Sequence, residues 1–157
     1  DVIEHKSDGV AYRKYDSELE LLCYCLMGNH FHLLFYQAAN AAALTDFMRA
    51  VSTAYTMYFN RKYKRVGPLF QGVYKSSRIS DESYLLHISR YIHLNPRTYK
   101  TYTYSSIAPY TGAPTPPWLK PQKILDLFED IDYPAFLEDY EEQKAIFDKL
   151  KYELANT

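Results

Sequence analysis

The sequence predicts an α+β fold in which helices are layered on a small antiparallel sheet. Two apolar segments, 19–26 and 30–36, flank the turn-forming residues Met27-Gly28-Asn29, a pattern that predicts a β-hairpin. Apolar side chains at helical spacing predict one helix over 41–58 and a second over about 80–95. Strands and helices therefore alternate within the first hundred residues, as an α+β domain requires.

The first helix is predicted by its apolar positions, which are Leu44, Phe47, Met48, Val51, Tyr55, Met57 and Tyr58. It is followed by a basic segment and then by Gly67-Pro68, which ends regular structure. Residues 69–79 are predicted to contain a further strand that carries Lys75 and Arg78. For the second helix we predict Ser80 as the N-cap, with acids in the first turn and an end before Pro96.

The C-terminal third differs in composition. Residues 109–121 contain five of the eight prolines, which predicts a linker or draped loop. Amphipathic acidic helices are predicted over 122–129 and 134–154. The expected organisation is a domain over 1–108, a linker over 109–121 and an acidic helical extension over 122–157.

Composition limits the function classes. Hydrophobic residues make up 47% of 157 residues, enough for a core, and no apolar run is long enough to span a bilayer. Residues 1–104 carry 13 Lys and Arg against 9 Asp and Glu, whereas residues 105–157 carry 5 against 10. A basic body with an acidic tail suits a nucleic-acid partner, and the tail is a candidate autoinhibitory cover for the basic groove. Two cysteines too close to bridge along a strand suggest a reducing, cytoplasmic location.

Two histidines, His30 and His32, are separated by one residue on the second predicted strand and therefore share a face of the sheet. Such a pair suits a metal ion. Together with Cys23 and Cys25 on the partner strand, the pair also allows a structural zinc site. The hairpin register decides between these sites: a two-residue turn places Cys25 opposite His32 on one face, and a three-residue turn separates them.

Polar residues also gather on one face of the second helix, where His87, Tyr91 and Asn95 recur at intervals of four. A tyrosine in this position is a candidate nucleophile. A basic cluster after the first helix, Arg61, Lys62, Lys64 and Arg65, suits phosphate contact because no acid interrupts it. The 17 tyrosines offer stacking surfaces for unpaired bases or serve as ordinary core residues.

Three ordered blocks resemble a known family. They are Cys25-Leu26-Met27-Gly28-Asn29-His30-Phe31-His32-Leu33-Leu34, Gly67-Pro68-Leu69-Phe70-Gln71-Gly72-Val73-Tyr74-Lys75-Ser76, and Tyr84-Leu85-Leu86 with Arg90-Tyr91-Ile92-His93-Leu94-Asn95-Pro96. In order and spacing they are similar to the REP-associated tyrosine transposases, which belong to the IS200/IS605-like Y1 transposases within the HUH nucleases. The resemblance extends over roughly 19–112, with Tyr104-Ser105-Ser106 matching the segment after the second helix. Gly28 stands where the family usually has proline.

The resemblance implies a ferredoxin-like antiparallel sheet with helices packed on one face. It implies that Tyr91 is the nucleophile and that His30, His32 and Asn95 hold Mg²⁺ or Mn²⁺, with His87 and Asn29 behind them. The implied substrate is single-stranded DNA near a hairpin, cut by a monomer or a homodimer. We expect the DNA contacts to come from Arg61, Lys62, Lys64, Arg65, Gln71, Lys75, Arg78 and Arg90. The family's first strand has no counterpart in residues 1–16. The alternatives are a non-catalytic hairpin-binding protein and a zinc-stabilised interaction domain.

Overall fold

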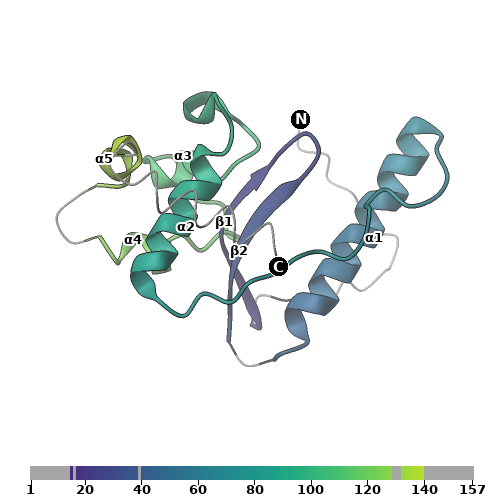
Figure 1. Cartoon of the computed structure of the whole chain (residues 1–157), viewed down its shortest axis with the longest axis horizontal. Helices are drawn as coiled ribbons and strands as arrows, with labels where there is room; N and C mark the ends of the chain where they lie inside the picture. The colour runs from purple at the N-terminus through teal and green to yellow at the C-terminus, as the bar shows by residue number, and fades with distance from the viewer. Residues whose placement is uncertain (1–14, 16, 39, 129–131, 140–157) are drawn as a thin grey trace.

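The computed structural model describes residues 15, 17–38, 40–128 and 132–139 (Figure 1). Its elements, in chain order, are β1 (Leu19–Leu26), β2 (Phe31–Gln37), α1 (Ala43–Tyr63), α2 (Glu82–Leu94), a 3₁₀ turn (Tyr99–Thr101), α3 (Ile107–Tyr110), α4 (Gln122–Leu125) and α5 (Tyr133–Glu138). The α+β class is thus confirmed. No helix among these residues is long and apolar enough to cross a membrane.

The predicted hairpin is present and forms the two-stranded antiparallel sheet of the described residues. Cys25 lies opposite His32 and Leu26 opposite Phe31, and the backbone N–H of Met27 donates to the His30 carbonyl at 2.8 Å. This is the two-residue-turn register. A ferredoxin-like sheet needs more strands than these two, so that detail stays a prediction.

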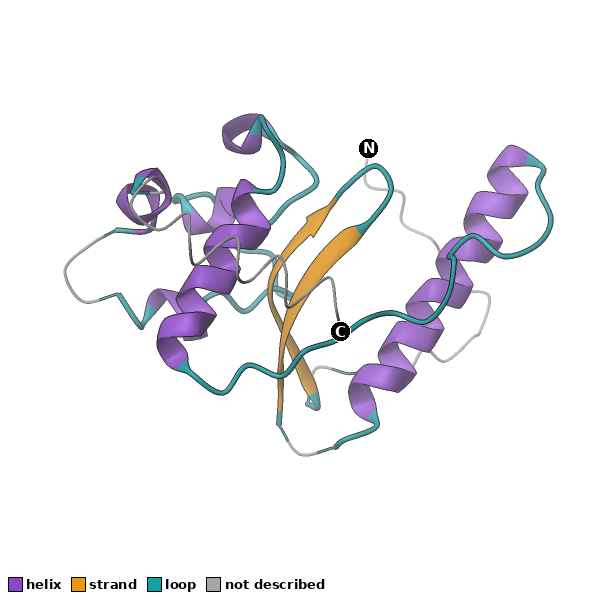
Figure 2. Ribbon diagram, viewed as in Figure 1, coloured by secondary structure: helices purple, strands orange, loops and turns teal. Residues whose placement is uncertain are grey.

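The hairpin lies between α1 and the other helices (Figure 2). Side chains alternate across β2: Leu34 belongs to the core cluster on the α2 side, and Phe35 packs edge-on against Phe47 of α1 with 5.1 Å between ring centroids. The expectation of helices on one face only is therefore wrong, because α1 contacts the opposite face.

α1 continues one turn beyond the predicted end at residue 58, because Arg61 and Lys62 are good helix formers and no breaker precedes Gly67. Lys64 ends the helix in the left-handed conformation, with φ of 51°. The Asn60 side chain then donates to the Gly67 carbonyl at 2.8 Å and fixes the following turn. The basic segment is therefore partly helical rather than entirely beyond the helix.

The strand predicted within 69–79 is wrong: this segment is irregular and joins α1 to α2. A strand requires a hydrogen-bonding partner, and among the described residues β1 and β2 pair only with each other as strands. Gly72, with φ of 134°, also interrupts an extended run.

α2 begins one residue later than predicted. Asp81, not Ser80, is the N-cap, and its carboxylate accepts a hydrogen bond from the Tyr84 backbone N–H at 3.1 Å. The helix ends at Leu94, with Asn95 as the C-cap before Pro96. The predicted end is confirmed.

The Pro-rich segment and the short helices after it are packed onto the domain. Leu119 is buried and forms a bridge with Leu21, where the backbone N–H of Lys120 donates to the Leu21 carbonyl at 2.8 Å. Residues 109–121 are therefore an edge covering for β1 rather than a spacer. α4 is a single turn, shorter than the predicted 122–129.

α5 lies against α2, on the side of the hairpin away from α1 (Figure 1). The described residues of the extension therefore do not cover the basic end of α1. Most of the helix predicted over 134–154 falls outside the described residues.

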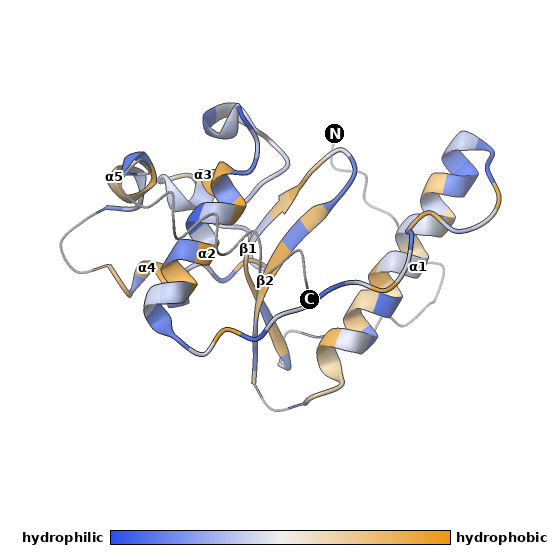
Figure 3. Ribbon diagram, viewed as in Figure 1, coloured by the Kyte–Doolittle hydropathy of each residue, from blue (hydrophilic) through white to orange (hydrophobic). Residues whose placement is uncertain are grey.

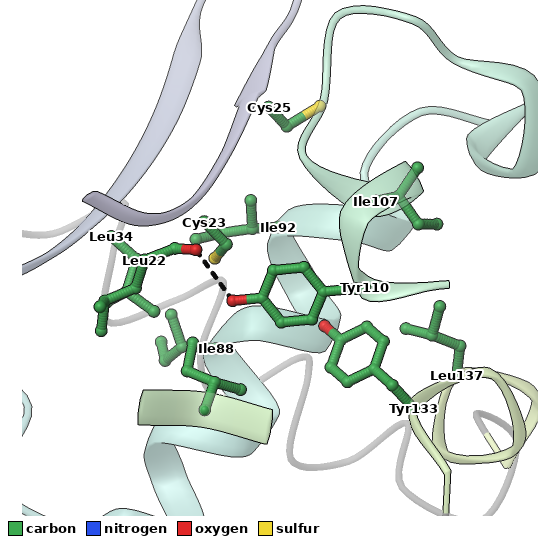
Figure 4. Close-up of a cluster of buried hydrophobic side chains, with 11 residues drawn as sticks. Leu22, Cys23, Cys25, Leu34, Ile88, Ile92, Ile107, Tyr110, Tyr133 and Leu137 are labelled. Atoms are coloured by element: carbon green, nitrogen blue, oxygen red, sulfur yellow. Dashed lines mark hydrogen bonds between the residues drawn. The ribbon is translucent and has the colours of Figure 1, made fainter. Parts of the chain in front are cut away.

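The core lies between the hairpin and α2 (Figure 4), and α3, α4 and α5 each contribute side chains to it. Its buried members are Leu22, Cys23, Cys25, Leu34, Ile88, Ile92, Ile107, Tyr110, Ile124, Tyr133 and Leu137. The Tyr110 hydroxyl donates to the Leu22 carbonyl at 2.9 Å, which satisfies the only polar atom of that side chain. This packing holds α2 in a fixed position on the sheet.

His93 is completely buried at the centre of a hydrogen-bond network. Its Nδ1 lies 2.7 Å from the Tyr133 hydroxyl and its Nε2 lies 2.7 Å from the Ser106 hydroxyl. Because Tyr133 itself donates to Ser89, Nδ1 carries the proton and Nε2 accepts from Ser106. Burial lowers the pKa of His93 to about 3, so the ring is neutral.

Replacing His93 with Phe is expected to lower the free energy of unfolding by about 2 kcal/mol, because it removes two buried hydrogen bonds, one to Ser106 and one to Tyr133. Urea denaturation followed by circular dichroism measures this change. Tyr104→Phe, at an exposed tyrosine, is the control and should leave stability within about 0.5 kcal/mol. A His93→Phe variant as stable as this control would contradict the role of the network.

Candidate active site

The packing of α2 turns Tyr91 towards β2. Ile88 and Ile92 are buried in the core, and Tyr91 is only partly buried, beside the strand that carries the histidines. Its ring stands edge-on to that of His32, with 5.2 Å between centroids. Two segments about sixty positions apart in the chain therefore meet at one point.

Asn95 joins these two side chains. Its carboxamide nitrogen lies 3.2 Å from Nε2 of His32, and its side chain also hydrogen-bonds to Tyr91, one helical turn earlier. The structure thus brings together His32, Tyr91 and Asn95, which the family resemblance had implied belong to one site.

His30 lies in the turn just before β2 and is exposed. Its ring centroid is 5.1 Å from that of His32, and its Nδ1 lies 2.7 Å from Oδ1 of Asn29. As expected, Asn29 is therefore a hydrogen-bonding partner of His30, and this bond orients the imidazole ring.

Burial controls the protonation of the site. It lowers the pKa of His32 to about 4, with a smaller contribution from His30, so His32 is neutral near pH 7 and its Nε2 accepts a hydrogen bond from the Asn95 carboxamide. Burial also raises the pKa of Tyr91, although the hydrogen bond from Asn95 opposes this shift. The Tyr91 phenol is therefore protonated in this structure.

Two imidazole nitrogens and a carboxamide oxygen, from His30, His32 and Asn95, are a donor set that suits a divalent ion such as Mn²⁺ better than Mg²⁺, because imidazole is a transition-metal ligand and the carboxamide oxygen suits both ions. The two imidazoles and the carboxamide converge from the turn, the strand and the helix. No three His, Cys, Asp or Glu side chains of the described residues gather as a metal site, and the candidate third donor beside the two histidines is the Asn95 carboxamide.

The alternative of a structural zinc site, formed by the cysteine and histidine pairs of the hairpin, is not supported by the environment of the thiols. The register does place Cys25 opposite His32, but both cysteines are buried in the core. The Cys25 thiol contacts the sulfur of Met27 at 3.5 Å, and burial raises the pKa of both thiols. Protonated, buried thiols act as small apolar side chains rather than zinc ligands.

The expected DNA-binding residues fall into two groups. The exposed group lies at the end of α1 and along the segment between α1 and α2, and consists of Arg61, Lys62, Lys64, Arg65, Gln71, Lys75 and Arg78. Figure 3 shows the last turns of α1 as mostly hydrophilic. Arg61, Lys62, Lys64 and Arg65 lie at the end of α1, on the α1 side of the hairpin, whereas the segment that carries Gln71, Lys75 and Arg78 crosses from α1 to α2, the helix that holds Tyr91 (Figure 1).

Arg90 departs from the expectation. It is completely buried, its guanidinium lies 3.5 Å from the ring centroid of Phe136, and it donates to the Asp139 carbonyl at 3.1 Å. Because α5 covers it, Arg90 is not a DNA-binding surface residue in this structure. His87 likewise faces α5, with its ring 6.0 Å from that of Phe136, and is not brought to the histidine pair.

Two residues that the sequence did not assign to the site support the turn that carries His30. The Tyr102 hydroxyl donates to the Leu26 carbonyl at 2.7 Å, and the Leu26 backbone N–H donates to the Tyr104 carbonyl at 2.8 Å. These bonds hold the end of β1 immediately before the turn that carries His30. The only sequence signal was the family-like segment that begins at Tyr104.

Comparison with known proteins identifies a family. The family model described as "Transposase IS200 like" matches residues 4–95, which is more than half of the chain and includes both histidines, Tyr91 and Asn95. No curated protein and no solved structure gives a significant match. The chain belongs to the IS200-like transposase family.

Proposed function

We propose that this chain cuts and rejoins single-stranded DNA near hairpins, with Tyr91 as the nucleophile. The observation that carries the proposal is the contact of three side chains: the Tyr91 ring against His32, with Asn95 hydrogen-bonded to both. A phenol beside a neutral imidazole and a carboxamide, from a strand and a helix held by one core, is an arrangement for phosphoryl transfer.

In the proposed reaction the Tyr91 oxygen attacks the scissile phosphorus. A bond forms between that oxygen and phosphorus, the bond to the 3′ oxygen breaks, and the departing 3′ oxygen gains a proton. The products are a 5′-phosphotyrosine and a free 3′-hydroxyl. Because the covalent link conserves the phosphodiester energy, a second 3′-hydroxyl can reverse the step and join strands.

The residues of the chain have separate tasks in this step. Because burial raises the pKa of Tyr91, its phenol is protonated before the reaction and must lose its proton on attack, and the Asn95 hydrogen bond favours the phenolate. His30, His32 and Asn95 would hold Mg²⁺ or Mn²⁺. The ion would supply Lewis-acid withdrawal of charge from the phosphate oxygens.

The test is covalent capture. The chain is incubated with Mn²⁺ and single-stranded hairpin DNAs labelled at the 5′ or the 3′ end, and the products are separated on a denaturing gel. We expect a slow-migrating protein–DNA band that carries the 3′ label, and no band in EDTA. Binding of the same DNAs without any covalent band would favour a non-catalytic hairpin-binding protein instead.

Removing exposed cations at the end of α1 is expected to weaken DNA binding without regard to sequence. For an Arg61→Ala, Lys64→Ala double variant we expect the slope of log K against log salt to fall by about 0.7 per lost phosphate contact. Fluorescence anisotropy across a salt series measures the slope. Lys120→Ala, at an exposed lysine beside β1, is the control, and equal slopes for the two variants would remove the α1 cations from the proposed DNA surface.

A further inference from the structure

A continuous series of aromatic rings runs from β2 to the end of α1. Phe31 packs against Phe70 with 6.1 Å between centroids, Phe70 lies 6.3 Å from Tyr55, and Tyr55 lies 6.1 Å from Phe59. The series continues to Tyr63, 4.4 Å from Phe59, and branches to Tyr58, 6.2 Å from Tyr55. We call these six residues the aromatic track: Phe31, Tyr55, Tyr58, Phe59, Tyr63 and Phe70.

The tyrosines of the track are largely exposed. Tyr55, Tyr58 and Tyr63 keep 48%, 52% and 55% of their surface accessible, whereas the core tyrosines Tyr110 and Tyr133 keep 4% and 3%. Packing of the domain therefore does not account for these three rings. Large exposed aromatic side chains grouped on one helix indicate a binding surface.

The charged side chains in the sequence segment that contains most of the track are all basic. Between Asp46 and Asp81 the sequence contains no acid and seven Lys and Arg residues. Lys62 lies 5.5 Å from the ring centroid of Tyr58 and 5.6 Å from that of Tyr63, and Arg65 lies 5.6 Å from that of Phe59. Cations thus stand directly beside the exposed rings.

The track begins next to the candidate active site. Phe31 is the residue between His30 and His32, and side-chain alternation places it on the opposite face of the same strand. In Figure 1 the segment after α1 runs back along that helix towards the hairpin, which brings Phe70 to Phe31. A single DNA strand that passes from the Tyr91 site around the edge of β2 would therefore reach the aromatic track directly.

We propose that the aromatic track stacks unpaired bases of the DNA strand that the Tyr91 site cuts, an inference that rests on the proposed function. Each base presents a π-face to a ring, and the adjacent cations neutralise the phosphates between successive bases. A second copy of this chain is a poorer occupant, because two acid-free cationic surfaces repel one another. A duplex also fits poorly, since its bases are already stacked.

Tyr58 offers a matched pair of variants. Tyr58→Leu removes the ring, and Tyr58→Phe removes only the hydroxyl, which accepts a hydrogen bond from Lys62 at 3.2 Å. Binding of fluorescein-labelled oligo-dT is measured by anisotropy in EDTA, where cleavage is absent. Tyr58→Leu should weaken binding about 5- to 50-fold, and Tyr58→Phe should bind within about twofold of the unmodified chain.

The salt dependence separates stacking from charge. Tyr58→Leu should leave the slope of log K against log salt unchanged, because it removes no charge, and Lys62→Ala should lower it. Tyr36→Leu, at an exposed tyrosine of β2 outside the track, is the control for loss of any surface ring and should bind as the unmodified chain does. Binding of a blunt duplex should be equal in all tyrosine variants.

The track is rejected if Tyr58→Leu and a Tyr55→Leu, Tyr58→Leu double variant bind oligo-dT as tightly as Tyr58→Phe. It is also rejected if these variants change the oligomeric state by size-exclusion chromatography and not the DNA affinity, which would make the surface a contact between copies. Covalent capture with Mn²⁺ is scored separately. An intact Tyr91 adduct with unaltered binding in the tyrosine variants would reject the track and leave the proposed function standing.

Discussion

Replacing Tyr91 with Phe is expected to abolish the covalent protein–DNA band while leaving DNA affinity within about twofold of the unmodified chain. The substitution removes one oxygen, which is the atom proposed to attack phosphorus, and keeps the ring against His32. Because Tyr91 is only partly buried and its hydroxyl contacts the Asn95 side chain, the fold should tolerate the loss. Denaturing gels with labelled hairpin DNA and Mn²⁺ measure the adduct, and anisotropy in EDTA measures affinity.

Two other tyrosines provide matched controls. Tyr84 lies on the same helix, two turns before Tyr91, and the hydroxyl of Tyr74 lies 3.0 Å from that of Thr45, beside α1. Tyr84→Phe and Tyr74→Phe should each form the adduct at the unmodified rate. An adduct that persists in Tyr91→Phe and disappears in either of these would assign the nucleophile to the other tyrosine.

The parts of the site that could be predicted are those set by local periodicity. Alternation between β2 and the residue just before it places His30 and His32 on one face, and a spacing of four places Tyr91 of α2 and its C-cap Asn95 on one face. Both patterns depend only on local backbone geometry. The hairpin register followed from the same logic, once the turn length was known.

The errors arose where distant segments decide the outcome. Arg90 and His87 have polar side chains suited to an exposed face, but Phe136, more than forty residues later, covers that part of α2. The predicted strand over 69–79 failed because a strand depends on a partner that the local sequence does not specify. In both cases the segment was judged alone, and a tertiary contact determined its state.

The aromatic track illustrates a third situation. The tyrosine content suggested either base stacking or core packing, and composition does not distinguish the two. The structure separates them by position: Tyr110 and Tyr133 are buried beside His93, whereas Tyr55, Tyr58 and Tyr63 are exposed on α1. The same residue type thus serves the core on one side of the hairpin and offers a surface on the other.

Replacing His32 with Ala is expected to slow adduct formation by at least about a hundredfold, the upper end of what loss of a side chain that orients a metal ligand costs. His32 has the central position, because it contacts His30, Tyr91 and Asn95 at once. Its removal takes away a proposed metal ligand and the surface against which the Tyr91 ring is held. Single-turnover rates at a series of Mn²⁺ concentrations measure the effect.

The concentration series separates the two roles of His32. If His32 only binds the ion, higher Mn²⁺ restores the rate of His32→Ala; if it also positions Tyr91, the rate stays low at saturating Mn²⁺. We expect the second result, because the His32 ring packs directly on Tyr91 and its Nε2 contacts the Asn95 carboxamide.

His30→Ala is the matched comparison. His30 is exposed and packs on His32 rather than on the nucleophile, so saturating Mn²⁺ should largely restore the rate of this variant. Equal, full recovery of both variants would limit His32 to metal binding, and an unchanged rate for His32→Ala at the lowest Mn²⁺ concentration that supports the unmodified chain would remove the histidine pair from the mechanism.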